Sequence, residues 1–357
     1  MRLGDSSVWL DDLSCAACSC PHELAHGGSF LVSGASGLVG SALVDLLLHL
    51  RARRGYAIAV TAVGRSRERL ERRFGSRPGL DFFITEADRP LAPAGRVDYL
   101  VHAASTASPD LYMSDPCGTI RANIDGIRSM LAYARAHRPR KVLYVSSSEI
   151  YGTRPRPGPA REGDYGRVDP LDPRACYAEA KRAAEAICAA YASQYGVPVA
   201  IVRPGHVYGP TATSGDRRVS SDFAFRAARG VPLVLKSAGT QVRSYCHCLD
   251  CATAMLTVLV RGASAQAYNV SNPDSVISIR KMAGLLAAAG GVPLLTAAPN
   301  AAERAAFNPM DDSSLDAAKL MSLGWRAVFP AETGLTRTVA ALKEVASHGQ
   351  VNLEESP

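Results

Sequence analysis

Residues 28–50 read GSFLVSGASGLVGSALVDLLLHL and carry the strongest indication of the fold. The apolar run 28–33 predicts a buried strand, and residues 41–50 predict a helix. Three glycines with G-x-x-G-x-x-G spacing lie between them: Gly34, Gly37 and Gly40. The first glycine permits a tight turn, the second lets the backbone approach a pyrophosphate, and the third lets the helix pack closely on the strand. The order of strand, glycines and helix therefore predicts a dinucleotide-binding fold.

The start of this helix is the predicted phosphate site. A helix N-terminus presents unbonded N–H groups and the positive end of the helix dipole, and both attract phosphate oxygens. We therefore expect the loop and the first helical turn to bind the cofactor through Gly34, Ser36, Gly37, Leu38, Val39 and Gly40.

The end of the second predicted strand, residues 57–63, bears on the choice between NAD and NADP. An NAD site usually has an acidic residue there that binds the ribose 2′-hydroxyl. This chain has Arg65 and Arg67 instead. Arg65 could accept the 2′-phosphate of NADP, or it could lie in solvent beside the next helix or stack on adenine. These residues alone leave both cofactors open.

Further apolar segments alternate with helical ones and extend the same pattern. The predicted strands span residues 81–85, 97–105, 141–145 and 198–203. Strands alternating with helices indicate an α/β fold with a doubly wound parallel sheet of the Rossmann type. The remaining predicted cofactor contacts follow these strands: Asp88, Ala103, Ala104, Ser105 and Pro204, with Asn123 holding the next helix to the active-site strand.

After residue 205 this alternation gives way to shorter segments. A helix is predicted over 218–229, and extended segments over 233–235, 243–249 and 267–270. They indicate a smaller C-terminal α/β domain that binds the substrate. The expected division is an N-terminal arm outside the main fold (1–27), an NAD(P)-binding domain (28–205), a mostly substrate-binding part (206–345) from which one strand returns to the large sheet, and a tail (346–357).

Composition places the chain among soluble globular proteins. It has 357 residues, 47% of them hydrophobic, and a net charge of +7, which allows a full core and suits an anionic ligand. No apolar run is long enough for a membrane span, and the N-terminus lacks the features of a secretion signal. Arginines are dispersed without a basic stripe interleaved with aromatics, which argues against nucleic-acid binding. We therefore expect a cytoplasmic protein.

Nine cysteines are present, and reduced thiols are expected in a chain of this kind. Two groups superficially resemble metal ligands: Cys15, Cys18 and Cys20 with His22, and Cys246, His247, Cys248 and Cys251. Neither group has paired C-x-x-C arms. The second is predicted to lie on a strand, where alternate side chains point to opposite faces. We therefore expect no metal.

A strand end and a helix supply the predicted catalytic groups. Three serines and a glutamate, residues 146–149, follow the strand at 141–145. Tyr177 and Lys181 lie four residues apart and so share one face of the next helix. Tyr177 would be the general base: its ordinary pKa is about 10, and the Lys181 ammonium would lower that value while holding the nicotinamide ribose. Ser147 would hydrogen-bond a sugar or alcohol hydroxyl that loses its proton as the carbon gives hydride to NAD(P)⁺.

From about residue 28 to about 340 the sequence resembles the extended short-chain dehydrogenases/reductases, and among them the NAD-dependent sugar-nucleotide epimerases, dehydratases and decarboxylases. The resemblance is carried by the glycine loop, SSSEIYG at 146–152, Tyr177 with Lys181, RPGHVYGP from Arg203, the Arg243-Ser-Tyr run followed by Asp250, and Leu-Gly-Trp at 323–325. It implies a nucleotide-sugar substrate, tightly held NAD⁺ in spite of the arginines after the second strand, and a homodimer formed through the helix that carries the catalytic tyrosine.

Within this family the motifs are most similar to those of the UDP-glucuronate decarboxylases. Those enzymes share RACY, here residues 174–177, and the KRxAE pattern that starts at Lys181. The pair Ser148-Glu149 occurs in them and in GDP-mannose 4,6-dehydratases. The resemblance implies oxidation of the sugar at C4, after which CO₂ leaves from C6 with the C4 ketone as electron sink.

The resemblance also implies a set of substrate contacts: Ser148, His206, Arg218 and Arg243. Arg243 would bind pyrophosphate or assist protonation at C5, and His206 replaces the Asn that is usual in its motif. Other reactions remain open. In a 4,6-dehydratase Glu149 would remove the C5 proton, and in a 4-epimerase the keto sugar would rotate and Glu149 would be structural. A catalytically silent NAD(P)-binding protein is the last alternative, and the intact Ser/Tyr/Lys set argues against it.

Overall fold

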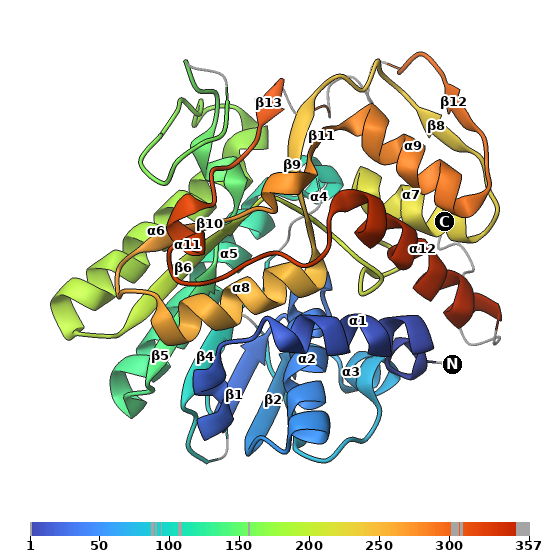
Figure 1. Cartoon of the computed structure of the whole chain (residues 1–357). Helices are drawn as coiled ribbons and strands as arrows, with labels where there is room; N and C mark the ends of the chain where they lie inside the picture. The colour runs from blue at the N-terminus through green and yellow to red at the C-terminus, as the bar shows by residue number, and fades with distance from the viewer. Residues whose placement is uncertain are drawn as a thin grey trace.

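A parallel sheet forms the centre of the molecule (Figure 1). The computed structural model describes residues 2–86, 89, 91–93, 95–105, 109–155, 158–300, 307 and 310–347, so the predicted adenine contact Asp88 lies outside the described residues. The strands run in the order β10-β6-β5-β4-β1-β2-β3, and every neighbouring pair is parallel. They are β1 (Gly28–Ser33), β2 (Ile58–Gly64), β3 (Leu80–Ile84), β4 (Tyr99–His102), β5 (Lys141–Val145), β6 (Val199–Pro204) and β10 (Ala267–Val270).

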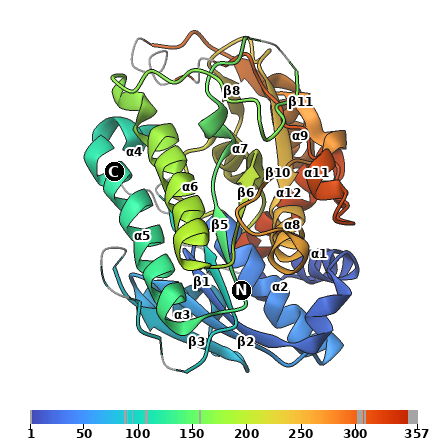
Figure 2. The ribbon, with the colours of Figure 1, turned by 90° about the vertical axis from the view of Figure 1, so that its left-hand side faces the viewer.

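Helices cover both faces of this sheet, which confirms the predicted doubly wound α/β fold. One face carries α2 (Leu38–Arg54), α3 (Arg67–Phe74) and α8 (Cys248–Arg261), whose apolar side chains share one core with β1 and β2. The other face carries α5 (Pro116–His137) and α6 (Cys176–Tyr195), which lie side by side in Figure 2 and enclose a second core.

The chain reverses direction across the sheet at β1. From β1 it moves to β2 and β3 on one side, and then crosses to β4 on the other side. The connections that leave the carboxyl ends of β1 and β4 therefore diverge and leave room for a ligand at that edge. This is the position at which the glycine loop and the predicted catalytic residues gather.

A smaller group of elements lies beyond the carboxyl edge of the sheet. It has short strands β7 (His206–Tyr208), β8 (Leu233–Leu235), β9 (Val242–His247), β11 (Val276–Ser278), β12 (Leu294–Thr296) and β13 (Asp312–Ser313). Its main helices are α7 (Val219–Ala228), α9 (Ile279–Gly290) and α12 (Ala331–Ser347), which enclose their own apolar core. The short elements are η1 (Leu3–Asp5), η2 (His22–His26), η3 (Ser148–Tyr151), η4 (Pro173–Ala175), η5 (Pro273–Ser275), α4 (Pro109–Ser114) and α11 (Ala318–Met321).

The N-terminal segment is part of the main core, so the expectation that it lies outside the main fold is wrong. Helix α1 (Ser7–Cys18) packs on α2, α8 and α12. Trp9 is fully buried, and its indole N–H donates to Asp45 on α2 at 2.9 Å. Arg337 on α12 donates to the buried carboxylate of Asp12. Burial of a tryptophan and a paired carboxylate ties this helix to both parts of the fold.

The second cysteine group also differs from its prediction. Strand β9 ends at His247, and α8 begins at Cys248, so the predicted extended segment 243–249 is two residues too long. His247 turns the chain by capping the new helix, its Nδ1 accepting from the backbone N–H of Leu249. Within the described ranges no three His, Cys, Asp or Glu side chains gather as metal ligands.

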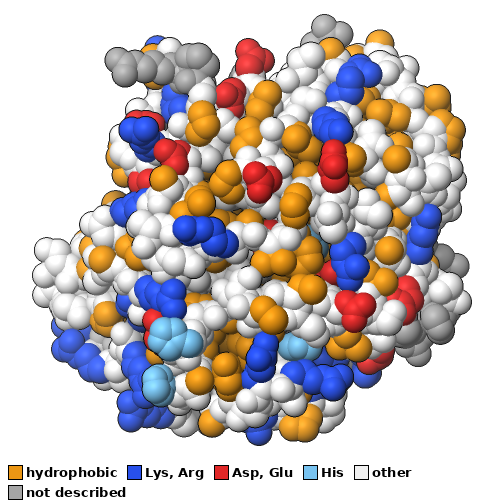
Figure 3. Space-filling view, in the orientation of Figure 1, with side chains coloured by type: hydrophobic (Ala, Val, Ile, Leu, Met, Phe, Trp, Pro, Cys, Tyr) orange, Lys and Arg blue, Asp and Glu red, His pale blue; other side chains and the backbone are white. Residues whose placement is uncertain are grey.

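The surface mixes charges of both signs. Figure 3 shows lysines and arginines interspersed with acidic and hydrophobic side chains over one face of the molecule. None of the helices in the described part of the chain combines the length and the apolar character needed to cross a bilayer.

Candidate active site

The glycine loop after β1 is shaped by close backbone contacts. Gly34 has φ +67°, and a Cβ there would lie 2.6 Å from the N of Ala104 and 2.7 Å from the carbonyl of Ala103. A Cβ on Gly40 would lie 2.3 Å from the carbonyl oxygen of Gly34. Only glycine fits both positions. The loop therefore passes directly against the end of β4, as a dinucleotide cradle requires.

The first turn of α2 is suited to a pyrophosphate. The helix begins at Leu38, three residues earlier than expected, and its N-cap Gly37 has no side chain to bond the first N–H groups. Ser36, Gly37 and Val39 keep some exposure, whereas Leu38 is buried and its carbonyl accepts from Thr211 at 2.8 Å. The predicted phosphate site thus presents backbone donors to solvent at a positive helix end.

The end of β4 is joined to its neighbours through side chains. Ser33 Oγ lies 2.8 Å from Nδ1 of His102 and accepts from the N–H of Ala104 at 3.4 Å. Ser105 donates to Asn123 on α5 at 2.7 Å. Asn123 therefore anchors the loop that follows β4. At the other predicted contacts, Pro204 is buried at the end of β6 and Arg65 is exposed at the end of β2.

Ser147, Tyr177 and Lys181 converge at the carboxyl edge of the sheet. Tyr177 lies in the first turn of α6 and is 6% exposed, and its hydroxyl is hydrogen-bonded with the side chains of Ser147 and Ser105. Lys181 is one turn further on, with its Nζ 5.7 Å from the centre of the Tyr177 ring. That ammonium donates to the carbonyl of Val145 at 2.8 Å. Fold and spacing thus bring the three predicted groups together.

Burial moves the pKa values of both helix residues against their charged forms. It raises the pKa of Tyr177, and the hydrogen bonds with Ser147 and Ser105 only oppose that rise. It lowers the pKa of Lys181 to about 7, although the negative charge of Glu185 acts in the other direction. The sequence led us to expect a lowered pKa for Tyr177. In the structure the pKa of Tyr177 is raised instead, because desolvation outweighs the other effects.

Glu149 lies next to this triad. It belongs to η3, where its backbone N–H donates to Ser147 Oγ at 3.2 Å. Its carboxylate lies 4.0 Å from the guanidinium of Arg174, and its charge contributes to raising the pKa of Tyr177. Arg174 was part of the RACY motif, but its link to Glu149 depends on folding that brings η4 against η3. Ser148 is buried and lines a narrow cleft with Arg154 and Ser314.

An aromatic contact that the sequence did not reveal involves Tyr177, the predicted general base. Tyr112 on α4 stacks on Tyr177 with ring centroids 4.7 Å apart and planes 10° from parallel. Both rings are buried. Nothing in the residues around Tyr112 marks it as a site residue, because the contact joins two helices distant in sequence.

The predicted substrate residues of the C-terminal part face the same site. Arg218 is the N-cap of α7, and its guanidinium is held by the carboxylate of Asp216. Its positive charge reaches Tyr177. His206 on β7 lies close to Arg218 and to Arg243 on β9. Burial and the positive charges of both arginines lower the pKa of His206. These charge interactions bring the guanidinium of Arg218 into the surroundings of Tyr177 and group His206 with both arginines.

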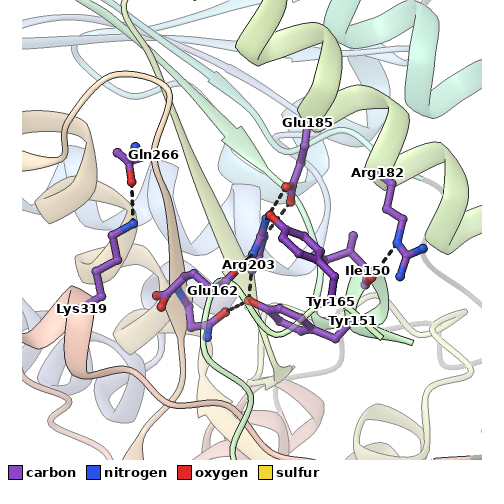
Figure 4. A network of polar contacts seen from close by, with 10 residues as sticks. Ile150, Tyr151, Glu162, Tyr165, Arg182, Glu185, Arg203, Gln266 and Lys319 are labelled. Carbon is purple, nitrogen blue, oxygen red and sulfur yellow. Dashed lines mark hydrogen bonds and ion pairs between the residues drawn. The ribbon is translucent and has the colours of Figure 1, made fainter. Parts of the chain in front are cut away.

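A buried ionic network supports α6 behind the site (Figure 4). Arg203 on β6 donates to both oxygens of Glu185, at 2.9 and 2.6 Å, and to Tyr151 at 3.0 Å. Glu185 lies one helical turn after Lys181. Arg182 donates to the carbonyl of Ile150 at 2.7 Å. The network thereby fixes α6 relative to β6 and to the segment that carries Glu149.

A glycine cradle at the switch point of a Rossmann sheet, next to a Ser–Tyr–Lys set, defines a short-chain dehydrogenase/reductase. The chain belongs to the NAD dependent epimerase/dehydratase family, which it matches over residues 30–271. Its cofactor is NAD, and the glycine loop and the first turn of α2 fit that molecule.

Two groups of relatives are similar over most of the chain. UDP-glucuronic acid decarboxylase 1 of Xenopus tropicalis is 32% identical over 333 residues, covering 92% of this chain and 75% of the relative. UDP-glucuronic acid decarboxylase 3 of Arabidopsis thaliana is 35% identical over 243 residues, covering 68% and 69%. Among solved structures, the UDP-glucose 4-epimerase of Thermus thermophilus in complex with NAD has a TM-score of 0.72 and 26% identity, covering 90% of this chain and all of the other. The dTDP-glucose 4,6-dehydratase DesIV of Streptomyces venezuelae, with a TM-score of 0.75, 24% identity and coverage of 91% and 100%, shares the fold.

Proposed function

We propose that this protein is a nucleotide-sugar decarboxylase that acts on UDP-glucuronate through oxidation at C4. The observation that carries the proposal is the position of Glu149, which adjoins the Ser–Tyr–Lys set and lies 4.0 Å from Arg174. The similarity to UDP-glucuronic acid decarboxylases over 92% of the chain supports the same reaction.

The first step is removal of the C4 hydroxyl proton by Tyr177. Ser147 hydrogen-bonds the same hydroxyl and keeps it in line with the phenol oxygen. When bound, NAD⁺ accepts the hydride that leaves C4, and its positive nicotinamide adds to the charges that favour a phenolate. Lys181, held by the carbonyl of Val145, orients the ribose hydroxyls and offers a route for the proton taken by Tyr177.

Loss of CO₂ follows from the ketone at C4. The carboxylate on C5 is then β to a carbonyl, so the electrons of the C5–C6 bond pass into the ketone as an enolate. The enolate takes a proton at C5, and Glu149 or Arg243 would direct that proton. Return of hydride to C4, with a proton from Tyr177, gives the UDP-pentose and restores the enzyme.

Product masses test this function. We expect incubation of the NAD-loaded protein with UDP-glucuronate to release CO₂ and give a UDP-pentose, and Tyr177→Phe to abolish that change. UDP-glucose, dTDP-glucose and GDP-mannose serve as comparison substrates. Loss of water from any of them would instead indicate a 4,6-dehydratase. An unchanged mass with altered chromatographic retention would indicate a 4-epimerase. If no nucleotide sugar reacted, a silent NAD-binding protein would be the remaining function.

We also propose which part of the chain binds each ligand and how two chains assemble. Residues 28–205 would hold the cofactor and 206–345 most of the substrate. A homodimer would form through α5 and α6, which lie together on one side of the molecule (Figure 2) and expose Ile120. All nine cysteines are free thiols, as suits a cytoplasmic location. Light scattering after size-exclusion chromatography tests the dimer, and cell fractionation tests the location.

A further inference from the structure

His206 lies on the face of a small sheet that looks toward the active site. Strand β7 is parallel to β9, with His206 opposite Tyr245. Residues opposite one another project from the same face, and so do residues two apart along a strand. His206, Tyr245 and Arg243 therefore share one face. The rings of His206 and Tyr245 confirm this, since their centroids are 5.9 Å apart.

The imidazole of His206 has hydrogen-bonding capacity that the protein does not use. Its Nδ1 is buried and has no hydrogen-bond partner among the residues that the structure describes. The residue as a whole keeps partial exposure. A buried ring nitrogen without a partner, on a residue that keeps partial exposure, leaves the imidazole able to change its hydrogen bonding when a molecule binds.

The groups that face His206 are mainly cationic. Arg243 comes from β9 and Arg218 from the start of α7, while Tyr245 contributes a neutral phenol. Burial and the charges of the two arginines lower the pKa of His206 to about 3, so the ring is neutral at physiological pH. Burial is the largest of these causes, and an anion would act only on the part that comes from the two arginines.

The two arginines differ in how their charges are balanced. Arg218 is held by the carboxylate of Asp216. Arg243 is 3% exposed, and in the described part of the chain its side chain donates to backbone carbonyls, those of Val242 at 2.9 Å and Asp311 at 3.3 Å. The negative charges of Glu149, Asp311 and Asp312 also reach this guanidinium, so a phosphate would add to a partial balance of its charge.

We propose that His206 takes up a proton when the diphosphate of a nucleotide sugar binds between Arg218 and Arg243. The anion offsets the two positive charges, and its own negative charge stabilises an imidazolium against the cost of burial. The imidazolium then donates a charge-assisted hydrogen bond to a phosphate oxygen. Since the ligand is taken to be a nucleotide sugar, the inference rests on the proposed function in that respect, but it does not require decarboxylation.

Calorimetry with a non-reacting complex tests the proton uptake. The full chain carries Tyr177→Phe, is loaded with NAD and is titrated with UDP-glucose, whose diphosphate does not titrate near neutral pH. Binding heats in buffers of different ionisation enthalpy give the number of protons exchanged. We expect uptake of about one proton at about pH 6 that declines above about pH 8, because an imidazole ordinarily titrates in this range. The affinity for UDP-glucose should then fall as pH rises through the pKa of His206 in the complex, by up to about tenfold per pH unit.

Variants assign the proton to one residue. His206→Asn in the same background should remove the uptake and the pH dependence of affinity. His137→Asn, an exposed histidine at the end of α5, should leave both unchanged. NMR of the chain labelled with ¹³C-histidine gives a second readout. The resonance that is missing from the His206→Asn spectrum is that of His206, and in the Tyr177→Phe protein it should move to the position of a protonated ring when UDP-glucose binds. This measurement identifies the proton acceptor even if His206→Asn does not bind the ligand.

Several results would overturn the inference. Binding without proton uptake, uptake that survives in His206→Asn, or an unmoved His206 resonance would each do so. If UDP-glucose and the other nucleotide sugars produced no binding heat, both proposals would fail together. Proton uptake without decarboxylation of UDP-glucuronate would reject the proposed function alone.

Discussion

The ring of Tyr112 stacks on that of Tyr177, with centroids 4.7 Å apart and planes 10° from parallel. In the proposed reaction Tyr177 holds its hydroxyl against the sugar, and this buried contact restrains the position of its ring. Aromatic stacking contributes about 0.5–1.5 kcal/mol beyond simple burial, and misplacement of a catalytic group reduces the rate in proportion.

We expect Tyr112→Leu to lower kcat by about 3- to 10-fold through loss of this stacking. Tyr112→Phe keeps the ring and should retain kcat within about twofold. Single-turnover formation of reduced cofactor measures the effect on the hydride step. Equal losses in both variants would show that the hydroxyl of Tyr112, rather than its ring, is what matters.

The hydrogen bond with Ser147 opposes the effect of burial on Tyr177, and this makes a prediction for the pH profile. Burial raises the pKa of Tyr177 and Ser147 lowers it. Since the phenolate is the active base, activity grows as pH rises through that pKa. Ser147→Ala should therefore move the acidic limb of the kcat profile to higher pH and lower kcat by about 10²- to 10³-fold.

Ser146 offers a matched control for this experiment. It is the preceding serine, it is buried whereas Ser147 is half-buried, and its hydroxyl has no hydrogen-bond partner in the described ranges. Ser146→Ala should leave the acidic limb in place. A shift of the same size in both variants would contradict a specific action of Ser147 on Tyr177.

The Arg203–Glu185 pair predicts a large loss of stability when one partner is removed. Arg203 is 2% exposed and donates to both oxygens of Glu185, at 2.9 and 2.6 Å. Glu185→Ala leaves the guanidinium buried without its carboxylate, which costs about 3–5 kcal/mol. Glu68, exposed in an ion pair with Arg72 on α3, is the control, and Glu68→Ala should change stability by less than about 1 kcal/mol. Urea unfolding measures both, and similar losses would contradict this role of burial.

Asp12 predicts a pH dependence of stability. Burial raises its pKa from 3.8 to about 6 in spite of the contact with Arg337. The folded state therefore binds more protons than the unfolded state between those values, and the contribution of Asp12 to stability increases as pH falls from about 7 to about 4. Asp12→Asn should remove that component, of about 2–3 kcal/mol. An exposed aspartate on β3 is the control, and Asp81→Asn should preserve the wild-type pH dependence of the unfolding free energy.

The residue that follows β2 leads to a prediction about the relative binding of NAD and NADP. Arg65 is exposed where the adenine ribose of a dinucleotide lies in this fold. If its guanidinium accepts a 2′-phosphate, Arg65→Ala should weaken NADP binding and leave NAD binding unchanged. Arg67→Ala, which removes a charge paired with Glu71 on α3, is the control. Fluorescence titration with both cofactors measures the effect, and equal weakening of NAD and NADP would exclude this role.

Local sequence patterns were enough to predict the Rossmann fold, the glycine cradle and the roles proposed for Ser147, Tyr177 and Lys181. These features depend on local patterns: the periodicity of strands and helices, the spacing of three glycines and the four-residue spacing of a helical pair. Each pattern restricts the backbone or a helix face within a short stretch, so it can be recognised before the chain folds.

Only the tertiary structure decided which distant groups surround that site. Tyr112 against Tyr177, Arg174 beside Glu149, and His206 facing Arg218 and Arg243 all join segments that are remote in sequence. The pKa values also belong to this level, because the burial that raises the value of Tyr177 is produced by the whole fold. Helix α1 shows the same limit: its helical pattern is local, but its place in the core depends on a pocket that α2, α8 and α12 create together.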